Sequence, residues 1–434
     1  MLNLLSGRPL MDCDGVSRRN FLRAGALGAG TLTLSGLLRG RAEAAALGQP
    51  VKDTSVVWLW LAGGPTHVET FDPKMSAPSD YRSTTGEVKT NIPGITLGGT
   101  FPEMAGHMDK LAVVRSFAHK NSGHGGGTHW VNTGYDNRSA DNGGVPSRPG
   151  YGAIVSRFRG PTNAKTGMPT YVALSRLSAG GAAFLGKACE PFSPSGEAKQ
   201  NMTLNVDRDR VPARRDLLAK IDDYRRDADR SGLMEGLDSY EEQAFDLVLG
   251  NAPKAFDLKD ENAELVKKYG NGLGQSMLQA RRLCEAGCGF VTISYGGWDM
   301  HGKVADSMKR RGPEVDHAVA TFLQDVYDRG MNQNILLVIT GEFGRTPRVN
   351  KNAGRDHWAP LSTLALAGGG LKMGQVVGES AAKVDVPASD PIGPQDLMAT
   401  VFHVVGIPQG VQYHDFFGRP VYMIEKGKPI RELV

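Results

Sequence analysis

Two side chains that could do chemistry, Glu342 and Arg345, follow closely after an apolar run at 335–340. A run of that length is too short for a helix of its own and predicts a fully buried strand of a parallel sheet. Ligands bind at the carboxyl ends of such strands, so a carboxylate and a guanidinium at this point indicate a functional site. The alternative is a surface turn with a solvated Glu–Arg pair.

Two further segments place histidine near acidic residues at predicted strand ends. Asp299 and His301 lie two residues apart after the apolar run 290–295, and His357 stands in a polar turn before another run at 362–367. An aspartate and a histidine that close together make a compact pair of metal ligands. All three residues are therefore candidates for a site at the strand ends.

The segment 119–129 is rich in both histidine and glycine, with three His and four Gly in eleven residues. A glycine-rich backbone that leads into a helix presents free N–H groups, so Gly125 and Gly126 are candidate anion-binding residues. Histidine at this density predicts metal binding or proton transfer, here by His124 and His129. The alternative is a flexible loop in which the histidines are incidental.

A further candidate follows the apolar run at 56–62, the first of the folded part. The next segment reads Gly-Gly-Pro-Thr-His-Val-Glu-Thr-Phe-Asp and contains His67, Glu69 and Asp72. His67 lies nearest the strand end, so we prefer it as the metal ligand of the three. Asp72 precedes Pro73 and is as easily a turn former.

Strands and helices that would position these residues alternate along the chain, which predicts an α/β fold. Residues 209–287 are polar, charged and helical in period, and we interpret them as a helical insertion or cap within one α/β domain that spans 51–434. Predicted strands lie at 56–62, 111–116, 170–174, 290–295, 335–340 and 362–367, and predicted helices at 315–327 and 390–406.

The composition is that of an ordinary globular protein. The 434 residues are 40% hydrophobic and 22% charged, enough for one large α/β domain. The net charge of +4 is spread along the chain and does not indicate a nucleic-acid partner. Cys284 and Cys288 lie four residues apart, but no second pair supports a metal or redox site. We expect both to be small buried hydrophobic side chains.

The first 46 residues are predicted to be a twin-arginine export signal. Arg18 and Arg19 precede a weakly apolar stretch at 24–38 that is rich in Gly and Ala, and small residues at 42–46 suit cleavage. No later segment is apolar for long enough to span a bilayer. The expected location is the periplasm or the extracellular space.

The order of these pieces resembles the alkaline phosphatase and sulfatase superfamily. The segment 315–344 looks like that superfamily's helix, strand and Asp-His-Gly metal loop, with Glu342-Phe343-Gly344 as the loop here. Residues 124–134 resemble the helix that follows the sulfatase nucleophile. Residues 395–408 resemble the superfamily's Asp-x-x-x-Thr and Gly-Ile-Pro run.

More closely, the mature chain is similar to an exported bacterial family catalogued as domain of unknown function fifteen-oh-one. The matching motifs lie at 298–301, 341–347 and 354–358 and read Trp-Asp-Met-His, Gly-Glu-Phe-Gly-Arg-Thr-Pro and Gly-Arg-Asp-His-Trp. A twin-arginine signal is also typical of that family. The resemblance implies a three-layer α/β sandwich with a largely parallel central sheet.

The resemblance also implies one or two divalent ions, such as Zn, Mn or Ca. Asp299, His301 and His357 would hold one ion, and His67 or Glu342 could rebuild a second position. The chain departs from the superfamily because Gly63 and Gly64 replace a metal-binding Asp, Phe343 replaces a His ligand, and His124 stands where a nucleophile is expected.

Two functions from different classes follow from this resemblance. The first is an exported metal-dependent hydrolase that uses metal-activated water on small anionic esters or on sulfated or phosphorylated glycans. Glu342 would be a ligand or the base, Arg345 would hold the anion, and His124 and His129 would orient the substrate or move a proton. The alternative is a non-catalytic metal- or anion-binding protein on a decayed sulfatase-like scaffold, which the missing nucleophile favours.

If these residues bind one metal site, their side chains must lie close together in the folded protein. We expect Glu342, Asp299, His301 and His357 to converge at one edge of the sheet, together with at least one of His67, His124 and His129.

Overall fold

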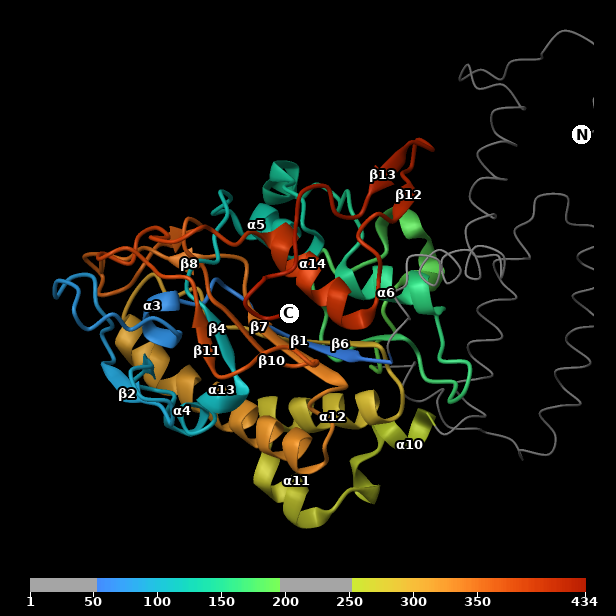
Figure 1. Cartoon of the computed structure of the whole chain (residues 1–434), viewed down its shortest axis with the longest axis horizontal. Helices are drawn as coiled ribbons and strands as arrows, with labels where there is room; N and C mark the ends of the chain where they lie inside the picture. The colour runs from blue at the N-terminus through green and yellow to red at the C-terminus, as the bar shows by residue number, and fades with distance from the viewer. Residues whose placement is uncertain (1–52, 196–251) are drawn as a thin grey trace, which may run out of the picture.

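The computed structural model describes residues 53–195 and 252–434 (Figure 1). The predicted export signal and most of the predicted helical insertion at 209–287 lie outside the described residues. Within the described ranges, no helix combines the length and the apolar character needed to cross a membrane.

A seven-stranded sheet forms the centre of the molecule, in the order β11-β4-β10-β7-β1-β6-β5. Only β10 runs against its neighbours, because it pairs antiparallel with both β4 and β7 while the other pairs are parallel. The predicted α/β class with a largely parallel sheet is therefore confirmed. The strands are β1 (Ser55–Leu61), β4 (Ala112–Val114), β5 (Tyr171–Ala173), β6 (Phe290–Tyr295), β7 (Ile335–Thr340), β10 (Leu364–Gly368) and β11 (Gln375–Val377).

The two central strands, β1 and β7, are apolar along their whole length because both faces of the sheet are covered. All seven residues of β1 and all six of β7 are buried. In β1, Val57 and Leu59 belong to the core on one face, while Trp58 and Trp60 belong to the core on the other. Alternate residues of a strand point to opposite faces, so a continuous apolar run is what a doubly covered strand requires.

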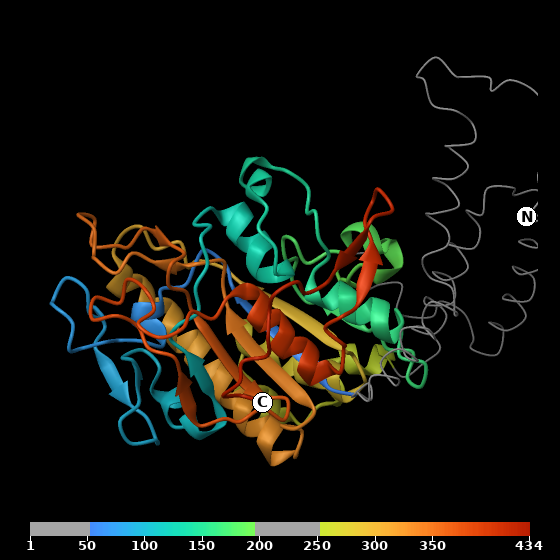
Figure 2. The same ribbon diagram turned by 45° about the horizontal axis from the view of Figure 1, so that its top comes forward.

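Helices lie on both sides of the sheet and make a three-layer arrangement (Figures 1 and 2). On one side lie α12 (Leu273–Glu285) and α13 (Val304–Asp328), with Met277 and Phe322 among their core residues. On the other side lie α5 (His124–Thr133), α6 (Tyr151–Arg159) and α14 (Pro394–Val405). The predicted helix at 315–327 is thus the second half of a longer one, since α13 continues through Pro313.

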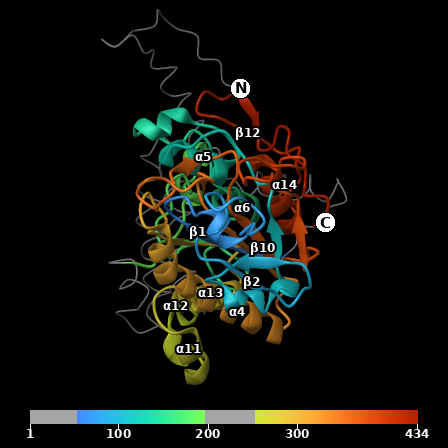
Figure 3. The same cartoon turned by 90° about the vertical axis from the view of Figure 1, so that its left-hand side faces the viewer.

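The remaining elements are short, and α11 lies outside α12 and α13 in the end-on view (Figure 3). Cys284 in α12 and Cys288 before β6 are both buried and free, as predicted. The small elements are α3 (His67–Thr70), β2 (Glu87–Lys89), β3 (Thr96–Gly98), α4 (Pro102–Ala105), α10 (Ala252–Phe256), α11 (Ala263–Tyr269), β8 (Gly344–Arg345), β9 (His357–Trp358), β12 (Gln412–His414) and β13 (Pro420–Tyr422).

Candidate metal centre

Loops at the carboxyl ends of three neighbouring strands build the candidate site. Glu342 follows β7, and Asp299 and His301 follow β6, which lies on the other side of β1. His357 comes from a later part of the chain. It reaches the site because β9 pairs antiparallel with β8, which places His357 opposite Arg345. The carboxyl ends of parallel strands share one sheet edge, so short motifs far apart in sequence meet there.

Three donor atoms form a small triangle at this edge. Asp299 Oδ1 lies 3.0 Å from His301 Nε2 and 3.2 Å from His357 Nε2. The two imidazole Nε2 atoms are 3.1 Å apart. Ligands at about 2.0–2.2 Å from a tetrahedral ion are roughly 3.3 Å from one another, so these spacings suit three ligands of one ion.

The far nitrogen of each imidazole has a partner that can only accept a hydrogen bond. His301 Nδ1 donates to Asp356 Oδ1 at 2.7 Å, and His357 Nδ1 donates to the Ser122 carbonyl oxygen at 2.9 Å. A neutral ring that donates from Nδ1 presents an unprotonated Nε2. If both rings are neutral in this way, their two Nε2 lone pairs lie 3.1 Å apart and repel each other unless a cation lies between them. The donor set therefore fits a divalent ion.

Burial and nearby charges keep two of the three ligand atoms, those of Asp299 and His357, free of protons. Partial burial disfavours ionised Asp299, but the hydrogen bond and charge of Arg345 lower the pKa of that carboxyl to about 2. Burial and then the Arg345 charge lower the pKa of His357. Asp299 is thus ionised and His357 neutral near neutral pH, which is the state a metal ion requires.

His124, the first residue of α5, lies between two carboxylates. Its Nδ1 is 2.8 Å from Glu342 Oε1, and its Nε2 is 3.5 Å from Asp299 Oδ2. The hydrogen bond to Glu342 is the main reason that the pKa of His124 is raised. His124, Asp299 and His357 also each offer a ligand atom within 4.8 Å of the others. His124 could therefore bind a metal or carry a proton.

Glu342 is buried beside this histidine, with a side chain only 4% exposed. Its Oε1 also accepts the backbone N–H of Gly63 at 2.8 Å. Its Oε2 is buried and has no hydrogen-bond partner among the described residues. A buried carboxylate oxygen without a partner is costly, so Oε2 is a further point at which a cation could be held.

Arg345 has internal partners, in contrast to the predicted role in holding an anion. Its Nε donates to the Gly64 carbonyl at 2.8 Å and its Nη1 to the Arg355 carbonyl at 3.1 Å. Its Nη2 donates to the Gly63 carbonyl and to Asp299 Oδ1, the latter at 2.5 Å. The side chain is fully buried. In this arrangement the guanidinium fixes Asp299 through Nη2.

At the start of α5, one of the two predicted anion-binding N–H groups already has a partner within the protein. The N–H of Gly126 donates to Asp141 Oδ1 at 2.7 Å, so the protein's own carboxylate takes this position. A Cβ on Gly125 would overlap the Ala140 carbonyl, and one on Gly127 would lie 2.8 Å from the Glu342 carbonyl oxygen. These glycines therefore serve close packing of the helix start against its neighbours.

Two predicted histidines lie apart from the donor cluster. His129 Nδ1 donates to the Tyr135 carbonyl at 2.8 Å, and its Nε2 accepts the N–H of Ser147 at 3.1 Å. His67 is buried with its Nε2 3.0 Å from the Val384 carbonyl. Among the hydrogen bonds of the described residues, neither ring contacts Asp299, His357 or Glu342. The structure therefore brings together His124, but not His67 or His129, with Asp299, His357 and Glu342.

Asp356 is a functional candidate that the sequence reasoning missed, although it precedes His357 directly. Asn350 Nδ2 donates to Asp356 Oδ1 at 3.2 Å and to the His301 carbonyl at 3.0 Å, so Asp356 and His301 are held together. Partners of this kind orient metal-binding imidazoles.

We expect Asp356→Asn to weaken divalent metal affinity by about 10–100-fold, because the amide no longer holds the Nδ1 proton of His301 as firmly. Calorimetric titration with Zn²⁺ would measure this change. The side chain is 53% exposed, so the thermal unfolding temperature should remain close to that of the wild type. Unchanged affinity would show that Asp356 does not position His301.

The fold and the cluster together define an α/β protein with a candidate metal centre at the carboxyl edge of its sheet. The chain belongs to the family described as "Protein of unknown function (DUF1501)", which matches residues 53–434. The resemblance expected from the three motifs is thus confirmed. A search of the curated proteins finds no match to the chain.

Solved structures that the chain matches include three enzymes. A sulfatase from Pseudoalteromonas sp. has 13% identity and a TM-score of 0.40, over 89% of this chain and 72% of that one. A lipoteichoic acid synthase from Listeria monocytogenes has 10% identity and a TM-score of 0.36, over 85% and 75%. A phosphonate monoester hydrolase from Silicibacter pomeroyi has 13% identity and a TM-score of 0.34, over 87% and 76%.

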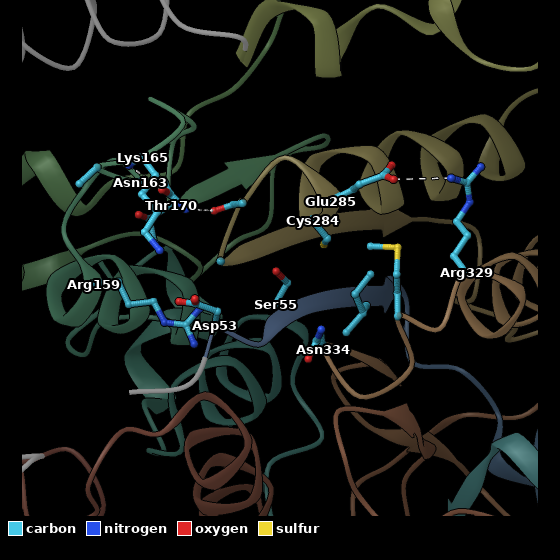
Figure 4. Close-up of a pocket in the computed structure, with 15 residues that line it drawn as sticks. Asp53, Ser55, Arg159, Asn163, Lys165, Thr170, Cys284, Glu285, Arg329 and Asn334 are labelled. Carbon is cyan, nitrogen blue, oxygen red and sulfur yellow. Dashed lines mark hydrogen bonds and ion pairs between the residues drawn. The ribbon is translucent and has the colours of Figure 1, made fainter. Parts of the chain in front are cut away.

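A cavity of about 710 Å³ lies at the amino-terminal ends of the central strands (Figure 4). Its lining includes Ser55 and Ile335, the first residues of β1 and β7, together with Arg159, Glu285 and Arg329. The donor cluster lies at the opposite, carboxyl ends of these strands. The cavity is therefore separate from the candidate metal centre.

Proposed function

We propose that this protein is an exported metal-dependent hydrolase of phosphate or sulfate esters. The observation that carries the proposal is the triangle of Asp299, His301 and His357, whose facing oxygen and Nε2 atoms lie 3.0–3.2 Å apart. A divalent ion held there would polarise an ester and lower the pKa of a water molecule.

The remaining residues would orient the substrate, transfer protons and hold Asp299 in place. His124 is 45% exposed and touches Glu342, so it can meet a substrate while its Nδ1 stays anchored. We assign to His124 the orientation of the ester or the transfer of a proton at Nε2, and to Glu342 the orientation of that ring. Arg345 would hold Asp299 in place through Nη2.

Turnover of two model substrates tests the proposal. Protein loaded with Zn²⁺ or Mn²⁺ should hydrolyse an aryl phosphate or an aryl sulfate, and His301→Ala should lose both the activity and the bound ion. The metal content of protein purified from its native compartment would identify the ion. If no ester is turned over while the metal binds tightly, the hydrolase proposal fails.

For His124, we expect that His124→Ala lowers metal content or kcat/KM at least tenfold, which is about 1.4 kcal/mol. His124→Gln should recover little if the residue must titrate, because an amide can accept a hydrogen bond but does not exchange a proton near neutral pH. Metal analysis and steady-state kinetics would measure both variants. Unchanged metal content and activity in His124→Ala would place the site wholly on the C-terminal half of the chain.

A second candidate function is a non-catalytic metal- or anion-binding protein. The internal partners of Arg345 and of the Gly126 N–H favour the metal-binding form of this function, because both groups would otherwise be free to hold an anion. Tight metal binding without turnover of any ester would support this function.

The export part of the proposal rests on the sequence before residue 47. Replacing Arg18 and Arg19 by lysine should hold the protein in the cytoplasm, because the transport route recognises the arginine pair. Cell fractionation with an antibody to the chain would measure this. Full export of the double variant would contradict a twin-arginine route.

A further inference from the structure

The guanidinium of Arg345 occupies a position lined by oxygen atoms. Its hydrogen-bond acceptors are the carbonyl oxygens of Gly63, Gly64 and Arg355 and the carboxylate of Asp299. Carbonyl and carboxylate oxygens are the ligands that hard divalent cations prefer. A permanently charged guanidinium with no exposed surface therefore stands where an oxygen-bound cation would be stable.

The neighbouring space is closed by an aromatic ring. A Cβ on Gly64 would overlap the ring of Phe343, and a Cβ on Gly63 would overlap the backbone nitrogen of Asp299. Phe343 is completely buried, and its ring centroid lies 4.4 Å from that of His357 and 5.1 Å from that of His124. Neither glycine position can carry a ligand side chain, so Gly63 and Gly64 could offer a cation only their carbonyl oxygens. Arg345 donates a hydrogen bond to each of these two oxygens.

We propose that Arg345 is a built-in second cation of the metal centre, and that the centre therefore takes a single divalent ion. This inference rests on the proposed function, because it assumes an ion on Asp299, His301 and His357. The guanidinium shares Asp299 with that ion, neutralises part of its charge and repels a further dication beside it. Arg345 is thus a positioning residue that acts through Asp299.

Counting bound ions in the wild-type protein tests the inference. Protein stripped of metal and then saturated separately with Zn²⁺ or Mn²⁺ should retain one ion per chain, measured by mass spectrometry of the metal after gel filtration. Two ions per chain would overturn the inference, and the free Oε2 of Glu342 is the group from which a second ion would be held. No bound ion would instead overturn the proposed metal centre, so the two failures are distinguishable.

A variant tests the role of Arg345 directly. Arg345→Ala should weaken Zn²⁺ affinity at least tenfold, because Asp299 loses its anchor, and millimolar guanidinium chloride should restore most of it by entering the oxygen-lined position. Arg345→Lys, which keeps a charge, should lose less. Near-ultraviolet circular dichroism would show whether each variant is folded, and the wild-type ion count still decides the proposal if one is not.

The matched control for this rescue is His301→Ala, which removes a ligand of the ion and leaves Arg345 in place. Guanidinium should not restore Zn²⁺ affinity in that variant. Full Zn²⁺ affinity in folded Arg345→Ala without added guanidinium would overturn the inference, as would equal rescue of both variants.

Discussion

Asp299→Asn is expected to remove the bound ion and to lower kcat/KM by at least about a hundredfold, or about 2.7 kcal/mol. Asp299 connects the residues of the proposed centre, since its Oδ1 contacts the imidazoles of His301 and His357 and the guanidinium of Arg345. An amide in its place would lack the negative charge that balances both the guanidinium and a divalent ion. Metal analysis and hydrolysis of an aryl ester would measure the two losses.

Asp306→Asn is the matched control, because Asp306 is an exposed carboxylate in the first turn of α13, outside the cluster. That variant should keep its metal and its activity. Asp299→Asn protein that retains one tightly bound ion and wild-type turnover would remove Asp299 from the site and, with it, the proposed centre.

Glu69→Ala is expected to lower the free energy of unfolding by about 3–5 kcal/mol, because it leaves a buried guanidinium without its partner. Glu69 Oε1 lies 2.8 Å from Arg355 Nη2, and neither side chain has any exposed surface. Arg355 directly precedes Asp356 and His357, so this ion pair also anchors the loop that carries them. Urea unfolding, followed by circular dichroism, would measure the change.

The matched control is the exposed pair Asp80 and Arg348, with N and O atoms 3.5 Å apart and side chains 58% and 69% exposed. Asp80→Ala should change the free energy of unfolding by only about 0–1 kcal/mol. Glu69→Gln combined with Arg355→Met should be more stable than Glu69→Ala, because no unpaired charge remains. A loss in Glu69→Ala no larger than that in Asp80→Ala would contradict the prediction.

The same pair predicts a dependence of stability on pH. Burial by itself would raise the pKa of Glu69, but the charge and hydrogen bonds of Arg355 outweigh it and lower the pKa below its ordinary value. The unfolded pKa is about 4.3, so the stabilisation is present above that pH and is lost as the pH falls through the lower folded pKa. In Glu69→Gln this part of the acid sensitivity should be absent.

Local sequence patterns were sufficient to predict the central strands. The run 335–340 became β7 with the predicted bounds, and the runs at 56–62 and 290–295 became β1 and β6. A strand that is covered on both faces must be apolar at every position, and that requirement is visible in a single sequence. The antiparallel direction of β10 was not predictable in this way, because strand direction depends on how the connecting segments cross the sheet.

The sequence by itself also determined which side chains could share an ion. Asp299 and His301 lie two residues apart after a predicted strand, and a parallel sheet brings such strand ends to one edge. The convergence of both residues with His357, Glu342 and His124 agrees with that reasoning.

Only the tertiary structure decided what each polar side chain has as its partner. Arg345 was predicted to hold an anion, but it donates hydrogen bonds to the Gly63 and Gly64 carbonyls and to Asp299. The N–H of Gly126 likewise donates to Asp141. His129 is hydrogen-bonded to the Tyr135 carbonyl and to the N–H of Ser147. A buried donor must be paired, and its acceptor can come from any part of the chain that packing brings close. Residue type therefore indicates what a side chain can bind, while packing determines whether it is free to bind it.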